Sequence, residues 1–152
     1  MSFRNSASFG KRMEYYIIGL MLKEGLDCYV PLVDDDGIDL IIRKNDNTFI
    51  EVQIKARSKN VKEGNTAFFV AITHELRENY FFVFYSERIN TIWIMSSKEF
   101  LDKCVTIKNG KDERKRSIKL NGKRKNVKTG EYEEYPLERF EKYIAKDFSR
   151  FK

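Results

Sequence analysis

Two runs of this chain, AFFVAI (67–72) and YFFVFY (80–85), consist entirely of apolar and aromatic residues. Successive side chains of a strand point to opposite faces of its sheet, so a strand built from either run is apolar on both faces. Such strands are stable only when both faces are covered, and they aggregate when exposed. We therefore predict that both runs are central strands of a sheet with a layer on each side.

Helical periodicity predicts one helix near each end of the chain. Apolar residues at helical spacing favour a first helix that begins at Ser6 or Ser8, either of which can cap it, and ends near Gly25. Its core face is formed by residues spaced three or four apart: Phe9, Met13, Tyr16, Ile17 and Leu20. A last helix is expected at about 136–151, opened by Pro136.

The middle of the chain reads as strands separated by turns. Further strands are predicted at 28–30, 38–43, 48–56 and 91–95. The acidic run Asp34–Asp36 is interpreted as a turn, and Ser96 and Glu99 as a capping box that opens a short helix. With 152 residues the chain is long enough for one domain, 1–152, of the α/β (α+β) class with one central sheet.

Positive charge is concentrated in one segment. Between Lys108 and Lys128, ten Lys or Arg stand against two acidic residues, a local charge of +8 in a chain whose total is +6, so the rest carries −2. Asn121-Gly122 is typical of a hairpin turn, which makes a basic β-arm at about 108–130 the favoured structure. Such a patch suits a polyanion, nucleic acid before an anionic membrane, although a solvated hairpin accounts for it equally well.

The strand TFIEVQIKAR (48–57) alternates in an unusual way, because its second face carries Glu51, Gln53 and Lys55. Asp39 would share that face if residues opposite each other in the hairpin have an index sum of 92, as a three-residue loop 45–47 requires. A two-residue loop would change the sum by one and send Asp39 to the other face, and a bulge would also shift the predicted register. A solvated sheet face is the alternative explanation, and for Glu51 the sequence supports solvation and metal binding equally.

Composition excludes several other classes. The two cysteines, Cys28 and Cys104, form no metal-binding or redox spacing, and we read them as reduced thiols of a cytoplasmic protein. The longest apolar runs have about six residues, too short to cross a membrane. His74, the only histidine, lies in the polar stretch THELRENY and is interpreted as a surface residue in preference to a general base.

GIDL followed by EVQIK resembles the core motif of the PD-(D/E)XK nuclease superfamily, in which Asp, a spacer, Asp or Glu, any residue and Lys form the site. Glu14 in FGKRMEYYIIG is similar to the acidic residue that many members carry on a first helix. The resemblance covers about residues 10–101, and it is greatest to group I intron-associated endonucleases and certain restriction enzymes. Departures are Ile38 in place of the motif proline and Gln53 in place of the second carboxylate.

This resemblance implies a restriction-endonuclease-like fold, with a central mixed β-sheet flanked by helices, and a divalent-metal-dependent DNA endonuclease activity of homing, restriction or junction-resolving type. Asp39 would be the central metal ligand, Gln53 a second ligand, Lys55 the catalytic lysine and Glu14 an auxiliary catalytic group, with Glu51 compensating for the neutral Gln53. The implied cofactor is Mg²⁺, with Mn²⁺ as a substitute.

The expected partner is DNA, held by a homodimer or a dimer of dimers because duplex cleavage needs two cuts. The cations expected to contact DNA are Arg57, Lys59, Arg114, Lys115, Arg116, Lys119, Lys123, Arg124 and Lys125. Two readings from other classes stay open: a catalytically inactive nucleic-acid-binding domain with the same fold, and an accessory protein that uses the polar strand face as a protein interface.

Overall fold

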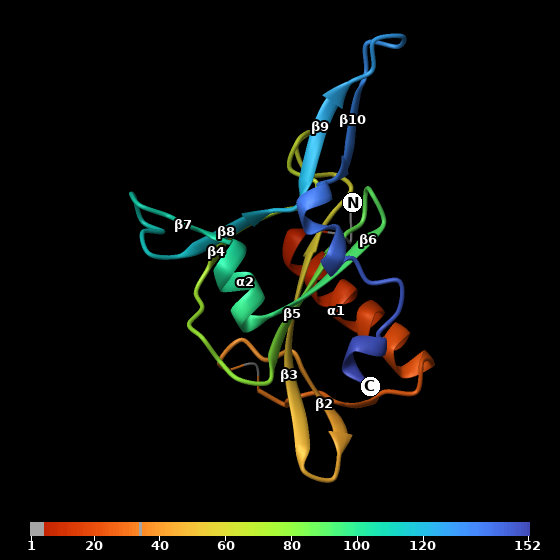
Figure 1. Cartoon of the computed structure of the whole chain (residues 1–152), viewed down its shortest axis with the longest axis vertical. Helices are drawn as coiled ribbons and strands as arrows, with labels where there is room; N and C mark the ends of the chain where they lie inside the picture. The colour runs from red at the N-terminus through yellow and green to blue at the C-terminus, as the bar shows by residue number, and fades with distance from the viewer. Residues whose placement is uncertain (1–4, 34) are drawn as a thin grey trace.

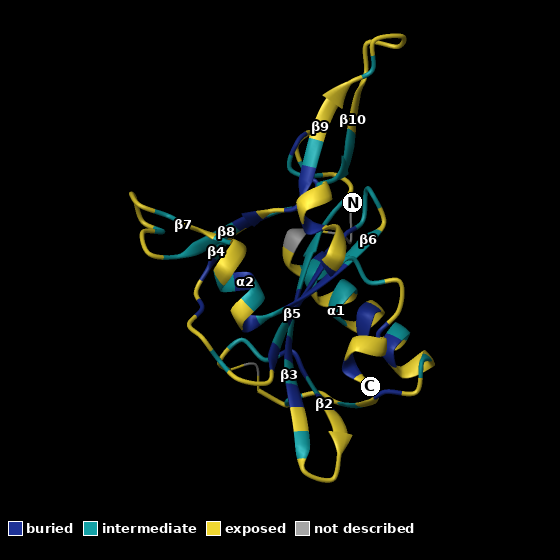
Figure 2. Cartoon of the chain, in the orientation of Figure 1, coloured by how far each residue is buried: buried dark blue, intermediate teal, exposed yellow. Residues whose placement is uncertain are grey.

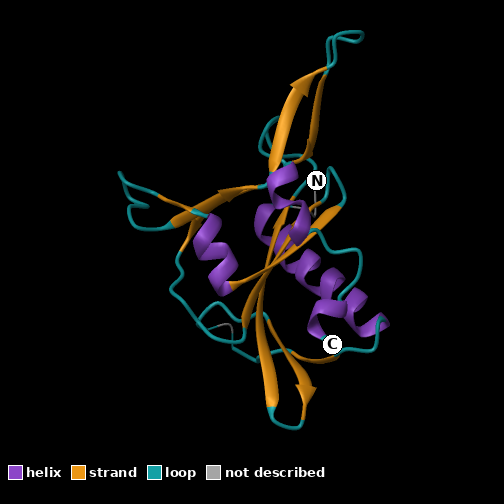
Figure 3. Cartoon of the chain, viewed as in Figure 1, coloured by secondary structure: helices purple, strands orange, loops and turns teal. Residues whose placement is uncertain are grey.

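A computed structural model of the chain, which describes residues 5–33 and 35–152, is built around a five-stranded sheet with the strand order β1-β2-β3-β5-β6 (Figures 1 and 3). Its strands are β1 (Asp27–Tyr29), β2 (Leu40–Asn45), β3 (Thr48–Arg57), β5 (Tyr80–Ser86) and β6 (Thr91–Ser96). β3 and β5 are parallel and the other neighbours antiparallel, so the predicted central mixed sheet is confirmed.

One face of the sheet is covered by helix α1 (Ser6–Lys23) and by the C-terminal 3₁₀ turn η2 (Ser149–Phe151). Ile17 and Met21 of α1 are fully buried against the apolar face of β3, which consists of Ile50, Val52 and Ile54. The cap of α1 is Asn5, whose Oδ1 accepts from the Ser8 amide at 3.0 Å, so the helix begins at Ser6 without the expected serine cap.

The opposite face is covered by helix α2 (Ser97–Lys103), the 3₁₀ turn η1 (Glu138–Tyr143) and a small second sheet. Phe82 and Phe84 of β5 are buried on this face, and Val83 and Tyr85 on the α1 face, so β5 is a central strand covered on both sides (Figure 2). The Ser96–Glu99 capping box of α2 is also confirmed. None of the helices described is long and apolar enough to cross a membrane.

The run AFFVAI is not a central-sheet strand, contrary to prediction. It forms β4 (Phe68–Ile72) in a second sheet with β8 (Arg116–Lys119) and β7 (Val105–Thr106), in the order β4-β8-β7. A register shift with Ala71 at φ 56° lets both Phe69 and Ile72 enter the core, while Val70 is exposed. The bulge explains why the run appears apolar on both faces although it buries only one.

Only part of the basic segment forms the β-arm: the arm spans residues 121–136 instead of about 108–130, β8 belongs to the second sheet, and Asn121-Gly122 is not the turn of the arm. Both residues belong to β9 (Asn121–Lys125), which pairs with β10 (Tyr132–Pro136) in a hairpin that projects from the body (Figure 1). Asn121 is buried and anchors the arm, because its Oδ1 accepts from the Ala67 amide and its Nδ2 donates to the Gly64 carbonyl. A Cβ on Gly122 would lie 2.6 Å from the Tyr135 ring, so a larger residue there would force the ring to move.

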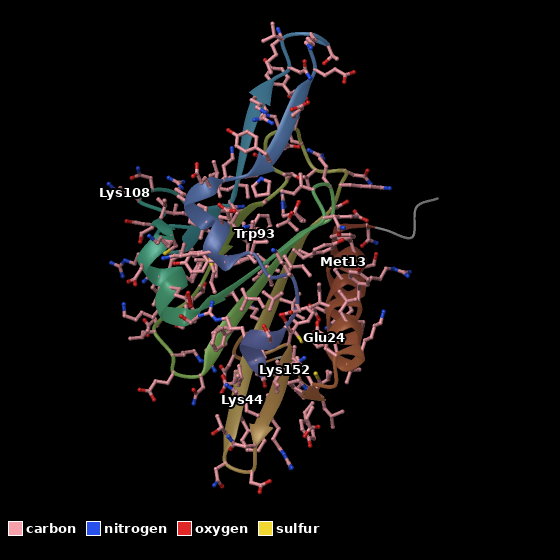
Figure 4. The ribbon with its side chains drawn as sticks, turned by 45° about the vertical axis from the view of Figure 1, so that its right-hand side comes forward. Met13, Glu24, Lys44, Trp93, Lys108 and Lys152 are labelled. Atoms are coloured by element: carbon pink, nitrogen blue, oxygen red, sulfur yellow. The ribbon has the colours of Figure 1, made fainter. Side chains whose placement is uncertain are left out.

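The expected C-terminal α-helix is also absent, since residues 136–151 contain only η1 and η2. Pro136 pairs with Asn121 as the end of β10, and Ile144 forms a β-bridge with Trp93 at the edge of β6. These pairings require extended backbone, which a continuous helix excludes. The end of the chain then returns to α1, where Lys152 lies 3.6 Å from the Glu24 carboxylate (Figure 4).

Candidate active site

The β2–β3 hairpin has the register that the proposed site demands, reached by a different route from the expected one. From Leu40↔Val52 to Arg43↔Phe49 the index sum is 92, as predicted. The connection, however, is a two-residue turn, with Asn45 opposite Thr48. A register shift between Arg43 and Asn45 leaves Lys44 as the extra residue and restores the sum.

Asp39 directly precedes β2 and is attached to β3 by two hydrogen bonds. Its amide donates to the Val52 carbonyl at 2.9 Å, and its Oδ2 accepts from the Ile54 amide at 2.7 Å. The carboxylate, which is buried, therefore reaches β3 between Gln53 and Lys55. The structure thus brings the three residues of the predicted motif together on adjacent segments.

Gln53 is held by two neighbours that the sequence did not single out. The Tyr80 hydroxyl donates to the Gly37 carbonyl at 2.6 Å and lies 3.2 Å from Gln53 Oε1. Gly37 has φ 66°, and a Cβ there would lie 3.1 Å from Gln53 Nε2. Asp36 and Gly37 form the expected turn, whereas Asp34 lies outside the described residues. The amide of Gln53 therefore sits between a fixed turn and a buried tyrosine.

Glu51 is engaged by an arginine from the loop before β5. Arg77 Nη2 forms an ion pair with the Glu51 carboxylate, Nη1 donates to the Asp36 carbonyl at 2.7 Å, and the guanidinium lies over the Tyr80 ring at 4.5 Å. Both side chains of the pair are about one-third exposed, at 33% and 35%. Arg77 belongs to the polar stretch THELRENY, where no periodicity marks it as different from a surface residue.

His74 is buried, so the surface reading of this residue is wrong. Its ring stacks on Tyr80 at 5.0 Å and its Nε2 lies 2.6 Å from Ser97 Oγ, which also accepts from the Arg77 amide. Burial, followed by the nearby cations Arg77 and Arg116, lowers the pKa of His74 to about 4. The imidazole is therefore neutral at pH 7.

A pocket of about 550 Å³ opens beside these groups. Its walls come from the Asp36 turn, from Gln53 on β3 and from the loop and strand that carry His74, Arg77 and Tyr80. The lining of the pocket thus includes one motif residue, Gln53, and one cation, Arg77. The pocket is large enough for part of a nucleotide-sized ligand next to Gln53.

Lys55 and Arg57 line a second, smaller hollow of about 160 Å³, which lies between β3 and β4. The Lys55 ammonium forms no hydrogen bond or ion pair with any residue the structure describes. Burial lowers the pKa of Arg57, and its buried Nε has no hydrogen-bond partner in the same part of the chain. Two neighbouring cations at a hollow, one of them incompletely satisfied, favour an anionic ligand.

Glu14 is not brought to this group of residues. Helix α1 covers the apolar face of β3, and the Glu14 carboxylate forms an ion pair with Lys11 at 2.8 Å. Within residues 5–33 and 35–152, no three Asp, Glu, His or Cys side chains gather as a metal site. The motif therefore offers a metal two oxygen ligands, the Asp39 carboxylate and the Gln53 amide. The nearby Glu51 carboxylate is paired with Arg77.

The cations expected to contact DNA fall into three groups. Arg57 and Lys59 follow the catalytic motif on β3 and in the loop after it. Arg116 points inward, where Nε donates to the His74 carbonyl at 3.0 Å, and Lys119 lies on the same strand, β8. Arg114 and Lys125 are exposed, one before β8 and one on the arm.

Several of these cations have acidic partners. Lys115 pairs with Asp112 at 3.1 Å, Lys123 with Glu63 at 3.0 Å, and Arg124 with Glu133 at 3.4 Å. Lys123 and Arg124 also lie over tyrosine rings of β10. The arm is consequently less positive than its first strand alone suggests.

Comparisons with known proteins identify the fold and the family of the chain. The chain resembles the bacterial homing endonuclease I-Ssp6803I, with a TM-score of 0.59 and 19% identity over 93% of this chain and 89% of that one, a similarity of fold. Among curated proteins, no sequence matches the chain. The family described as PD-(D/E)XK endonuclease matches residues 4–135, which include every residue of the motif. The chain therefore belongs to the PD-(D/E)XK endonuclease family.

Proposed function

We propose that this protein is a divalent-metal-dependent DNA endonuclease that hydrolyses phosphodiester bonds at the site formed by Asp39, Gln53 and Lys55. The observation that carries the proposal is the hydrogen bond from the Ile54 amide to the Asp39 carboxylate, which unites the separated parts of the motif. Family membership supports the nuclease assignment, with homing, restriction and junction resolution as the candidate roles.

The donor set fits Mg²⁺, or Mn²⁺ in its place. Asp39, Gln53 and Glu51 offer only oxygen ligands, and Mg²⁺ is usually bound by one or two carboxylates while it keeps several waters. When bound, the cation would polarise the phosphate and lower the pKa of a water. Asp39 and Gln53 would hold it, and Glu51 would join them after leaving Arg77. Glu14 stays outside this set, because α1 covers the other face of β3.

Lys55 and Arg57 are proposed to act on the phosphate itself. The Lys55 ammonium, without an acidic partner among the described residues, would neutralise charge that develops on the scissile phosphate and orient the attacking water. Arg57, two residues further along the same strand face, would hold the adjoining phosphate in the hollow that both side chains line. Partial burial of these cations strengthens both interactions relative to an exposed lysine or arginine.

DNA binding is assigned to cations in the loop after β3, in and just before β8, and on the arm formed by β9 and β10. Contacts from Lys59, Arg114, Lys119 and Lys125 to the backbone would supply affinity without reading sequence. The ion pairs of Lys115, Lys123 and Arg124 would exchange their carboxylates for phosphates. Two cuts in a duplex require two copies of this site, so a homodimer or a dimer of dimers is proposed.

A catalytically inactive DNA-binding domain is the second candidate. It is favoured by one observation: Gln53 is neutral and Glu51 is paired with Arg77, which leaves Asp39 as the carboxylate at the motif. Such a domain would bind DNA with or without metal. Replacement of Asp39 by Asn would then leave binding unchanged or improve it by removing a negative charge.

Cleavage of supercoiled plasmid and of branched DNA, with Mg²⁺ or Mn²⁺, tests the proposal. Asp39→Ala and Lys55→Ala should each abolish metal-dependent nicking while DNA binding persists. Lys44→Ala and Asp46→Ala are matched controls, because both residues are exposed at the tip of the same hairpin, and they should cut like the wild type. Cleavage that survives Asp39→Ala would exclude the proposed site, and metal-independent binding without any cleavage would favour the inactive domain.

A further inference from the structure

Arg77 is the one cation among the residues that line the 550 Å³ pocket, since His74 is neutral there. Its guanidinium has three neighbours: the Asp36 carbonyl, the Glu51 carboxylate and the face of Tyr80. Stacking on Tyr80, which is 2% exposed, fixes the plane of the guanidinium. The side chain is therefore held in place while one-third of it remains exposed, and it lines the pocket.

The ion pair between Arg77 and Glu51 is a weak lock. Pairs with this degree of exposure shift an equilibrium by no more than about fivefold, because water screens both charges. An arginine also binds phosphate with two parallel charge-assisted hydrogen bonds, the same geometry that it uses for a carboxylate. A DNA phosphate that enters the pocket can thus replace Glu51 at little cost.

We propose that Arg77 binds a backbone phosphate of the DNA, and that its ion pair with Glu51 withholds this carboxylate from the metal site until the phosphate displaces it. The inference rests on the proposed metal-dependent nuclease function. Glu51 lies two residues before Gln53, so both side chains leave β3 on the same face. Its release adds a negative charge beside Asp39 and Gln53, which raises the affinity of the site for a divalent cation.

This exchange explains two features together. The described residues gather no cluster of three acidic or histidine ligands, although Glu51 lies on the strand of the motif. Gln53, unlike a second carboxylate, contributes no charge to the site. Release of Glu51 would therefore tighten metal binding by up to about fivefold once DNA occupies the pocket.

Mn²⁺ binding to the DNA-free protein, measured by isothermal titration calorimetry, tests the lock through a double-mutant cycle. Arg77→Gln, which can still donate to the Asp36 carbonyl, should tighten Mn²⁺ binding roughly fivefold. The same substitution in a Glu51→Gln background should give no gain beyond that of Arg116→Gln. Arg116 is the matched control, because it also lies near His74 but has no contact with Glu51 in the structure.

The phosphate contact has its own measurement, namely the salt dependence of duplex binding in EDTA. Loss of one phosphate contact in Arg77→Gln should reduce the slope of log K against log salt by about 0.9. An unchanged slope overturns the phosphate assignment, and an equal gain in Mn²⁺ affinity with and without Glu51 overturns the lock.

Failure of the inference is distinguishable from failure of the proposed function. If the wild type cuts DNA but the double-mutant cycle shows no coupling between Arg77 and Glu51 in Mn²⁺ affinity, only the role of Arg77 is refuted. A wild type that neither cuts nor loses Mn²⁺ affinity on Asp39→Ala refutes the metal-dependent site itself, and the inference with it.

Discussion

Acidification should destabilise this protein through His74, its only histidine. The pKa of the imidazole is lowered to about 4 in the folded state by burial and by Arg77 and Arg116, whereas in the unfolded chain it is about 6.5. A depressed pKa means that the unfolded state binds the proton more readily. The resulting stability is complete above pH ~6.5 and is lost as the pH falls towards about 4.

The magnitude follows from the two pKa values. Each unit of difference corresponds to about 1.4 kcal/mol, so protonation of His74 should remove about 2.5 kcal/mol of unfolding free energy between neutral pH and pH ~4.5. Urea unfolding, followed by fluorescence of the buried Trp93, should be compared in the wild type and in His74→Gln. The variant keeps every carboxylate, so the difference between the two proteins isolates the imidazole.

The wild type should lose its advantage over His74→Gln steadily as the pH falls. A difference that stays constant within about 0.5 kcal/mol across this range would refute the argument. It would mean that the imidazole reaches water when it is charged and that the bond to Ser97 does not restrain it.

Four other predictions concern the arm and the site. Tyr80→Phe removes the hydroxyl that donates to Gly37, which should cost about 1–3 kcal/mol in urea unfolding, whereas Tyr29→Phe at an exposed position should change little. Glu134→Ala removes a carboxylate, 5% exposed, that accepts hydrogen bonds from the Gly64 and Thr66 amides and pairs with Arg88. It should lower the free energy of unfolding by about 3 kcal/mol and increase hydrogen exchange at the Gly64 amide. Glu133→Ala, which removes one partner of an exposed pair, should do neither. Gly122→Ala should destabilise by about 1–3 kcal/mol because its Cβ meets the Tyr135 ring, and Gly19→Ala, with open space on α1, should instead stabilise by about 0.5–1 kcal/mol; thermal melts that order the two the other way would contradict this packing. Lys125→Ala should lower the salt dependence of DNA binding by about 0.9 in log–log slope, and equal slopes would remove the arm from the DNA interface.

Local patterns in the sequence identified the elements that local physics controls. The first helix follows from apolar periodicity, α2 from its Ser96–Glu99 capping box, and β5 from a run that has to be buried on both faces. The register of Asp39 against β3 agrees with the prediction only because the bulge at Lys44 offsets a two-residue turn where a three-residue loop was expected. The motif residues came from resemblance to a family whose membership the comparison confirmed.

Errors arose where contacts distant in sequence overrode the local signal. AFFVAI lies outside the central sheet because it pairs with β8, more than forty positions later, and the bulge at Ala71 brings both Phe69 and Ile72 into the core. Asn121-Gly122 is no turn because Asn121 bonds to Gly64 and Ala67, more than fifty positions earlier in the chain. The last helix is replaced by 3₁₀ turns because Ile144 pairs with Trp93.

The sequence by itself thus determined the class of fold and the strand that carries Gln53 and Lys55, since periodicity and burial act over a few neighbouring residues. Only the tertiary structure decided the surroundings of that strand. Arg77, His74 and Tyr80 come from a polar loop and the strand after it, and their partners at Glu51, Ser97 and Gly37 lie twenty or more positions away. Which cation pairs with which carboxylate, and whether the single histidine is kept neutral, depends on distances in space that no pattern along the chain encodes.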